Sequence, residues 1–161
     1  QDCAPAQAAL AGLYLTGRGV PQSDGAAARW FALAADQGHA GAQTVLALMH
    51  LEGRVDDASD RRAAHWLRDA GEAGFAPAQY NLAVLHLQGR GVERDPELAA
   101  QWLRRAAEAG YVPAQRRLAE ALEHGVGTAR DEVAACTWYA VAAQAGDPSA
   151  GRSRECLALS M

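Results

Sequence analysis

The sequence contains no lysine, since all 15 basic residues are arginines. Without a lysine amine the chain cannot form a Schiff base, hold phosphate with the lysine of a P-loop, or use a Ser-x-x-Lys pair for acyl transfer. Long apolar runs are lacking too, and none reaches the roughly 18 residues typical of a transmembrane helix. We therefore expect none of these lysine chemistries and no membrane insertion.

A strong charge of one sign is also lacking. The 19 acidic and 15 basic residues are interspersed along the chain and leave a formal net charge of -4. Nucleic-acid-binding domains usually carry a basic patch or stripe. We expect no nucleic-acid partner.

Cysteine is scarce, with Cys3, Cys136 and Cys156 the only three. They match neither a metal-binding Cys-x-x-Cys pattern nor a dense disulfide framework. Cys136 lies in the last tryptophan-bearing segment and Cys156 in the segment expected to pack on it, so a disulfide between them is one hypothesis and two buried free thiols the other. The start at Gln1, followed by Asp2 and Cys3, would suit a chain released by signal-peptide cleavage. We expect a periplasmic or secreted location, with the cytoplasm as the alternative.

What the chain does contain is a repeat of 36 residues. Its four tryptophans, Trp30, Trp66, Trp102 and Trp138, all follow this step. An alanine series keeps the same step from Ala6 to Ala150. A fixed period in this range predicts an all-α solenoid, in which each repeat buries its apolar face against its neighbours.

Each repeat is expected to form two helices. In the first, apolar residues recur at helical spacing, prolines stand at the start and a glycine follows the end. The second begins after an N-cap residue, carries the tryptophan and ends at another glycine. The N-cap residues are Ser23, Ser59, Asp95 and Asp131.

This register predicts a single solenoid domain over residues 1–161. The full repeats are 6–41, 42–77, 78–113 and 114–149, which we number 1 to 4. Residues 150–161 begin a fifth repeat and are expected to form a capping helix with a solvated outer face.

The loop between the two helices differs in repeat 2. It reads Gly-Arg-Gly-Val at 17–20 and at 89–92, whereas residues 53–56 read Gly-Arg-Val-Asp. The β-branched Val55 stands where the other repeats have a second glycine. We therefore expect the loop of repeat 2 to follow a different path.

The pattern Ala-Gln-x-x-Leu-Ala-x-Leu-x-x-x-Gly-Arg-Gly-Val, followed by Asp, Ala-Ala-x-Trp, Ala-Ala-x-x-Gly and Pro-Ala, resembles the Sel1-like repeat, a relative of the tetratricopeptide repeat. The resemblance covers nearly the whole chain. It implies a right-handed superhelix of helix pairs whose first helices line a concave surface. Proteins of this kind look like bacterial adaptors and scaffolds that bind other proteins, and some resemble periplasmic or secreted host-interaction and toxin-immunity factors.

One stripe of the first helices is the candidate binding surface. If Leu10, Leu13 and their equivalents face the core, the neighbouring stripe changes from small to apolar to charged residues along the repeats. Such a trough with a polar wall suits a peptide or protein partner held by a few apolar side chains. The alternative is that its leucines are partly covered or are scattered surface residues. The residues expected to bind the partner are Leu48, Leu51, Tyr80, Val84, Leu87, Arg116, Glu120, Glu123 and His124.

Other clusters are expected to be structural. His50 and His86 take one position in successive repeats, but no third ligand is evident, so we predict a role between helices and no metal or cofactor. The acidic residues of the repeat 2 loop, Asp56, Asp57 and Asp60, lack the EF-hand spacing and precede a helix N-terminus, where negative charge is favourable. The tryptophans are expected to form the core between repeats.

These observations predict a non-enzymatic scaffold that binds a protein or peptide and no small-molecule substrate. An immunity protein that blocks a secreted bacterial toxin is a narrower alternative. An enzymatic function is the third alternative, because a cysteine-rich branch of the family resembles penicillin-binding or β-lactam-hydrolysing proteins. The present chain has neither the paired cysteines of that branch nor a lysine for acylation.

Overall fold

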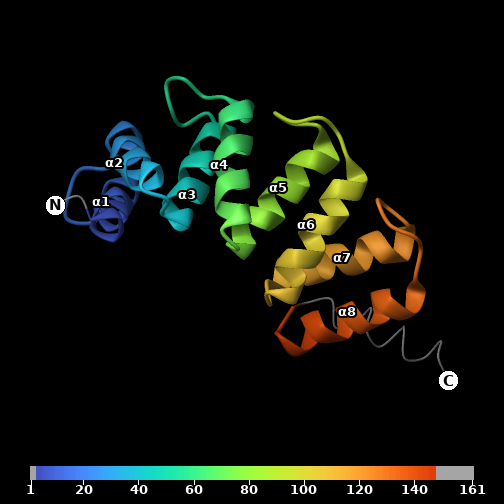
Figure 1. The fold of residues 1–161 in the computed structure, drawn as a ribbon. Coiled ribbons are helices and arrows are strands. Elements are labelled where there is room, and N and C mark those ends of the chain that lie inside the picture. Colours follow the sequence, from blue (N-terminus) through green and yellow to red (C-terminus); the bar gives the residue numbers. More distant parts are fainter. Residues whose placement is uncertain (1–2, 148–161) are drawn as a thin grey trace. The chain divides into compact units, whose positions relative to one another are not determined.

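The computed structural model describes residues 3–147 (Figure 1). This part of the chain forms eight helices joined by loops. This described part contains no strand. The capping helix expected at 150–161 lies outside it. In chain order the helices are α1 (Ala4–Thr16), α2 (Asp24–Asp36), α3 (Ala40–Leu51), α4 (Asp60–Glu72), α5 (Ala76–Gln88), α6 (Pro96–Glu108), α7 (Val112–His124) and α8 (Glu132–Gln144).

The helices divide between two compact units. Unit 1 comprises Gln1–Ala78 and Arg90–Glu93, and unit 2 comprises Gln79–Gly89 and Arg94–Met161. The division falls within α5, so that unit 1 holds α1 to α4 and unit 2 holds most of α5 with α6 to α8. The single domain expected for residues 1–161 stays a prediction.

The helix ends follow the capping signals in the sequence. The Ser23 hydroxyl accepts a hydrogen bond from the Ala26 N–H. The carboxylates of Asp95 and Asp131 likewise accept from the N–H groups of Leu98 and Ala134. These bonds satisfy N–H groups that a helix start leaves without partners. At the other end, Gly125 closes α7 in the left-handed conformation with φ 70°.

Alanine builds the inside of both units. The alanines that recur at matching places in the second helices are buried, and Ala34, Ala70, Ala106 and Ala142 are fully enclosed. Small side chains here permit close helix packing, and leucines fill the remaining space. The tryptophan prediction is confirmed only in part, because Trp102 is 7% exposed whereas the other three are half-buried.

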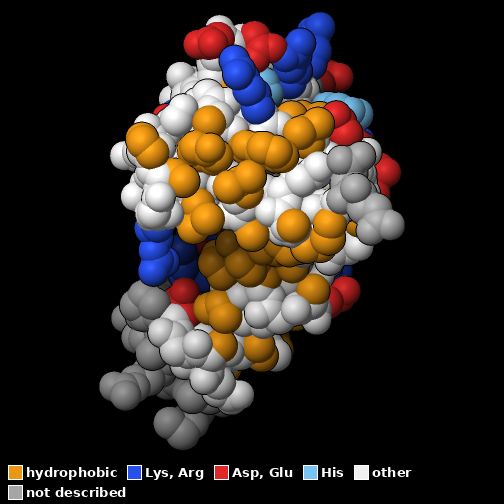
Figure 2. Space-filling view, turned by 90° about the vertical axis from the view of Figure 1, so that its left-hand side faces the viewer, with side chains coloured by type: hydrophobic (Ala, Val, Ile, Leu, Met, Phe, Trp, Pro, Cys, Tyr) orange, Lys and Arg blue, Asp and Glu red, His pale blue; other side chains and the backbone are white. Residues whose placement is uncertain are grey.

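The prediction that Leu13 faces the core is wrong. Leu13 is 42% exposed, whereas its equivalents Met49 and Leu85 are 1% and 2% exposed. In unit 1, α3 packs against both α2 and α4, but α1 packs mainly against α2, since no helix pair precedes it in the described chain. Apolar side chains are accordingly visible on the surface of α1 and α2 (Figure 2), and Leu33 of α2 is exposed as well.

Candidate functional site

An ion pair joins the loop of repeat 2 to the start of α2. The guanidinium of Arg54 donates two hydrogen bonds to the Asp24 carboxylate, with N–O distances of 2.9 and 2.7 Å. Both side chains are about one-third exposed, so solvent weakens their attraction. The hydrogen bond from Arg54 holds the pKa of Asp24 below its ordinary value. Because Asp24 belongs to repeat 1, this contact fastens one repeat to the next.

The same contact recurs one repeat later within unit 1. Arg90 Nε donates to Asp60 at 2.7 Å, and another nitrogen of Arg90 donates to the Leu51 carbonyl at 2.6 Å. Next to it, Gly91 lies so close to the Asp60 backbone that any Cβ would overlap the carbonyl. The second glycine of the loop thus permits the loop to lie directly on the preceding repeat.

These ion pairs were not predicted from the sequence, although their residues recur with the period of the repeat. Arg54 and Arg90 are 36 residues apart, as are Asp24 and Asp60, so each arginine follows its aspartate by 30 positions. At the junction of repeats 3 and 4 both positions change, the arginine to Val126 and the aspartate to Pro96. A charged pair that recurs with the repeat, and is lost from both positions together, indicates a contact.

The loop of repeat 2 departs from the path of the other loops, as predicted. In the other three repeats the N-cap residue donates its N–H back to the first helix, as Asp95 does to the His86 carbonyl at 2.9 Å. Within residues 3–147, Ser59 makes no corresponding bond, and the His50 carbonyl accepts instead from Gly53. Val55 carries a Cβ where Gly91 has none, so this loop cannot approach the preceding helix as closely.

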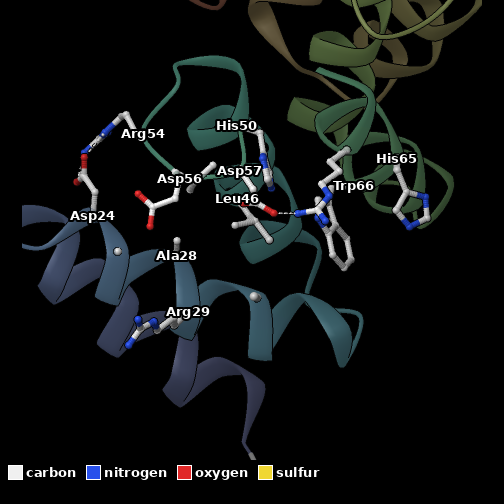
Figure 3. Close-up of a pocket in the computed structure, with 14 residues that line it drawn as sticks. Asp24, Ala28, Arg29, Leu46, His50, Arg54, Asp56, Asp57, His65 and Trp66 are labelled. Atoms are coloured by element: carbon white, nitrogen blue, oxygen red, sulfur yellow. Dashed lines mark hydrogen bonds and ion pairs between the residues drawn. The ribbon is translucent and has the colours of Figure 1, made fainter. Parts of the chain in front are cut away.

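A pocket of about 630 Å³ lies beneath this displaced loop (Figure 3). One face of α2, the end of α3, the loop and the first turns of α4 line it. The inner part is apolar, with Leu46 buried and Trp66 half-buried. The mouth carries three aspartates and three arginines, of which Arg54 binds Asp24 and Arg62 binds Asp57.

His50 lines this pocket and is only 6% exposed. Its Nδ1 atom is enclosed and has no hydrogen-bond partner in the described chain. Burial lowers the pKa of the imidazole, and the nearby charge of Arg62 lowers it further. The ring is therefore neutral at pH 7 and carries one nitrogen that can accept a hydrogen bond.

In unit 1 the predicted partner-binding residues are Leu48 and Leu51, both on α3 and both half-buried. Thr44, one turn earlier on the same stripe, is buried and donates its hydroxyl to the Ala40 carbonyl. The stripe in this unit therefore contributes two partly accessible leucines.

In unit 2 the predicted residues Tyr80, Val84 and Leu87 are half-buried on α5. The ring of Tyr80 packs edge-on against Tyr111, with centroids 5.5 Å apart. Arg117 hydrogen-bonds to Tyr80, and this bond holds the pKa of the guanidinium above its ordinary value. Tyr80 thus already has partners within the unit.

The predicted charged wall of α7 is internally paired. Arg116 contacts the carboxylates of Glu120 at 3.3 Å and Asp147 at 3.4 Å, and Arg117 contacts the same Glu120 at 3.1 Å. These contacts occupy both arginines, including Arg116, which was expected to bind the partner. The wall is a network of charges that neutralise one another.

The remaining wall residues differ in exposure. Glu123 accepts a hydrogen bond from the Tyr139 hydroxyl at 2.7 Å, which ties α7 to α8. The side chain of His124 is 61% exposed. Of the wall, His124 is the residue most open to solvent.

Three predicted residues meet at a second, smaller pocket in unit 2. Leu87, Glu120 and His124 line a cavity of about 160 Å³ together with apolar residues of α6 and α7. Val126, 41% exposed, and Arg117 stand at the same cavity. It is smaller than the 300–1,000 Å³ typical of small-molecule sites. Its size and lining suit a single apolar side chain with a polar group beside it.

The other predictions concern metals, membranes and disulfides. Residues 3–147 hold no cluster of three or more His, Cys, Asp or Glu side chains that would fit a metal ion, and none of their helices has the length and apolarity needed to cross a membrane. Cys3 is exposed and free, whereas Cys136 is disulfide-bonded. Cys156 lies outside the described residues, so the Cys136–Cys156 pairing stays a prediction.

Comparison with protein families gives four consecutive matches to the Sel1 repeat, at residues 4–39, 40–75, 76–111 and 112–147. The chain is a Sel1-repeat protein. The matched Sel1 repeats have the predicted period and begin two residues before the boundaries expected from the sequence. Each contains one helix pair of the structure. Sel1-repeat proteins are generally protein-interaction scaffolds and typically have no enzymatic activity.

Solved structures of other Sel1-repeat proteins are similar to this chain. One is c5321, described as a protective antigen of uropathogenic Escherichia coli with an SLR fold, at 34% identity and a TM-score of 0.87 over 91% of this chain and 31% of that one. Another is a Sel1 repeat protein from Oxalobacter formigenes, at 31% identity and a TM-score of 0.89 over 99% and 64% of the two chains. The present chain thus spans less than two-thirds of the length of either.

A more distant structure shows the same fold. Cysteine-rich protein B of Helicobacter pylori is 17% identical, with a TM-score of 0.61 over 76% of this chain and 89% of that one. At this identity the likeness concerns the helical repeat architecture alone. A comparison with curated protein sequences finds no significant match.

Proposed function

We propose that this Sel1-repeat chain is a non-enzymatic scaffold that captures a peptide or protein, and that Leu87 is a central anchor point. The small cavity lined by Leu87 carries this proposal, because three of the residues predicted from the sequence, Leu87, Glu120 and His124, meet at it. Apolar pockets with a polar rim are typical places for the few side chains that dominate a protein interface. The partner inserts one apolar side chain there.

The paired charges of α7 support a role in orientation. Glu120 and Asp147 together neutralise Arg116 and Arg117, so these charges offer a partner little net charge. Such a rim favours hydrogen bonding and correct register over strong electrostatic attraction. Affinity at this site therefore comes mainly from burial of the inserted side chain.

The test is selection of binding peptides from a displayed library, followed by affinity measurement on variants. Leu87→Arg fills the cavity with charge, and we expect binding to weaken roughly 30-fold or more, as for an interface hot spot. Val133→Arg is the matched control, because Val133 is 79% exposed and lies outside the cavity. Leu51→Arg tests the predicted anchor of unit 1 separately.

Folding of each variant is checked by circular dichroism and thermal melting. If Leu87→Arg fails to fold, Val126→Arg charges the same cavity from its exposed rim. If a folded Leu87→Arg or Val126→Arg protein binds every selected peptide as tightly as the wild type, Leu87 is not part of the binding site.

We also propose a periplasmic or secreted location, with the cytoplasm as the alternative. The disulfide at Cys136 supports it, because disulfides persist mainly in oxidising compartments. Fusion of the natural gene product to alkaline phosphatase, which is active only after export, tests this location. An inactive fusion of normal abundance would favour the cytoplasm.

A further inference from the structure

We propose that the pocket beneath the loop of repeat 2 is a second binding site, which takes the basic side chain, arginine or lysine, of a protein partner. It lies in unit 1, on α2, α3, α4 and the loop, and shares no residue with the Leu87 cavity of unit 2. It rests on the proposed function only in that the ligand belongs to a protein.

The pocket exists because several residues of repeats 1 and 2 are unusual together. Gly25, Ala28 and Ala32 give one face of α2 small side chains, and Val55 keeps the loop away from that face. The corresponding cleft at α6 has Arg104 where α2 has Ala32, and its lining includes neither a histidine nor a tryptophan. The deep aromatic pocket is therefore a feature of this place rather than of every repeat.

The inner lining suits the aliphatic stem of a long basic side chain. Leu46, Ala28 and Ala32 supply apolar surface. In Figure 3 the indole of Trp66 lies on the same side of the pocket as Leu46. Arginine and lysine bury their methylene groups against such surface while their charged ends stay in a polar setting. An indole face also attracts a cation.

The charge at the mouth favours a cation. Arg54 is neutralised by Asp24, and Arg62 by Asp57. Asp56 has no ion pair in the described chain, and its carboxylate extends into the space between the loop and α2 (Figure 3). Arg29 also belongs to the lining, but its guanidinium lies on the side of α2 away from Asp56 in this view. The charge left facing the pocket is negative.

His50 provides a further reason to expect a hydrogen-bond donor. Buried polar atoms in folded proteins almost always have a partner, yet the enclosed Nδ1 of His50 has none in residues 3–147. Guanidinium and ammonium groups carry donors only, and a neutral imidazole has one accepting nitrogen. A basic side chain therefore carries donors of the kind that both the Asp56 carboxylate and a neutral imidazole accept.

The experiment is titration of the whole chain with Nα-acetyl-arginine amide and Nα-acetyl-lysine amide, observed through the indole N–H signal of Trp66 in ¹H–¹⁵N NMR. Trp66→Phe assigns that signal. We expect saturable shifts with dissociation constants on the order of millimolar, as befits a single side chain. Nα-acetyl-norleucine amide has a similar stem without charge, and Nα-acetyl-glutamate amide has the opposite charge. Neither is expected to saturate.

Variants separate the site from a general charge effect. Asp56→Asn is expected to weaken binding of the basic probes at least about fivefold, whereas Asp36→Asn, an identical change at an exposed residue outside the pocket, leaves it unchanged. The pair Val55→Gly with Asp56→Val restores Gly-Arg-Gly-Val and is expected to close the loop and abolish binding. Leu87→Arg should have no effect, so this site and the Leu87 site can fail independently.

Three results would overturn the proposal. One is binding of the norleucine amide as tight as that of the arginine amide, which would mean that the pocket binds the apolar stem and does not recognise the charge. Another is preference for the glutamate amide, which would mean that Arg54 or Arg62 dominates. The third is unchanged affinity in a folded Asp56→Asn protein.

Discussion

The loops of repeats 2 and 3 begin with the same two residues and then diverge. Both place an arginine on an aspartate of the preceding repeat, Arg54 on Asp24 and Arg90 on Asp60. After the arginine, Gly91 lets one loop lie against the backbone at Asp60, whereas Val55 holds the other away and leaves a pocket. The difference shows that the ion pair fastens the loop, while the residue after it decides whether the junction is closed or open.

The largest effect is expected from exchanging that deciding residue. Gly91→Val would force a Cβ into the Asp60 carbonyl in a left-handed conformation, so we expect a loss of about 3 kcal/mol or more of unfolding free energy. Gly19→Val is the control, because Gly19 has the same positive φ but open space around it, and should cost about 1–2 kcal/mol. Urea unfolding followed by tryptophan fluorescence measures both. Equal losses would show that close contact at Gly91 does not matter.

A smaller effect is expected from the N-caps that follow the two loops. The Asp95 carboxylate accepts from the Leu98 N–H at 2.9 Å, whereas the Ser59 hydroxyl accepts from Arg62 at a longer 3.4 Å. We expect Asp95→Ala to cost about 1 kcal/mol and Ser59→Ala about half of that. The same urea titrations compare them, and a larger loss for Ser59→Ala would contradict the ranking.

Near neutral pH the smallest effect concerns the histidine under the open loop. Because the pKa of His50 is lowered on folding, the unfolded chain binds a proton that the folded chain does not, and stability falls as the pH drops below about 6.5. At about pH 5.5 this contribution is at most about 1.4 kcal/mol. His50→Leu, which copies Leu122 of repeat 4, should remove it. Identical changes in stability between about pH 7.5 and 5.5 for wild type and variant would sink this account.

The helical repeat was predictable because its signals are local and occur four times. Proline at a helix start, Ser23 or Asp95 at an N-cap and glycine after a helix each act within a few residues. Their agreement across repeats fixed the helices closely. The different path of the loop at Val55 was predictable for the same reason, since one residue type was out of place in an otherwise regular series.

The contacts of charged side chains were harder to predict. Arg116 and Arg117 stand four and three residues before Glu120, so helical spacing allows both pairs. It does not show that Asp147, beyond α8, pairs with Arg116 as well. The predicted burial of Leu13 was wrong for a related reason. Periodicity identifies the apolar face of a helix, but it does not show whether another helix covers that face. The pocket under the repeat 2 loop depends on Val55, His50 and Trp66 meeting in space, which no single stretch of sequence reveals.

The glycine contact at the junctions has a consequence for how such arrays grow by duplication and how they are cut for engineering. Gly91 meets the backbone of Asp60, and Gly127 meets that of Pro96, so each loop is matched to the second helix of the repeat before it. A boundary drawn between two helix pairs separates these matched halves. The exchangeable module therefore runs from the second helix of one repeat through the loop of the next, and chimeras joined just before a second helix keep these contacts within one module.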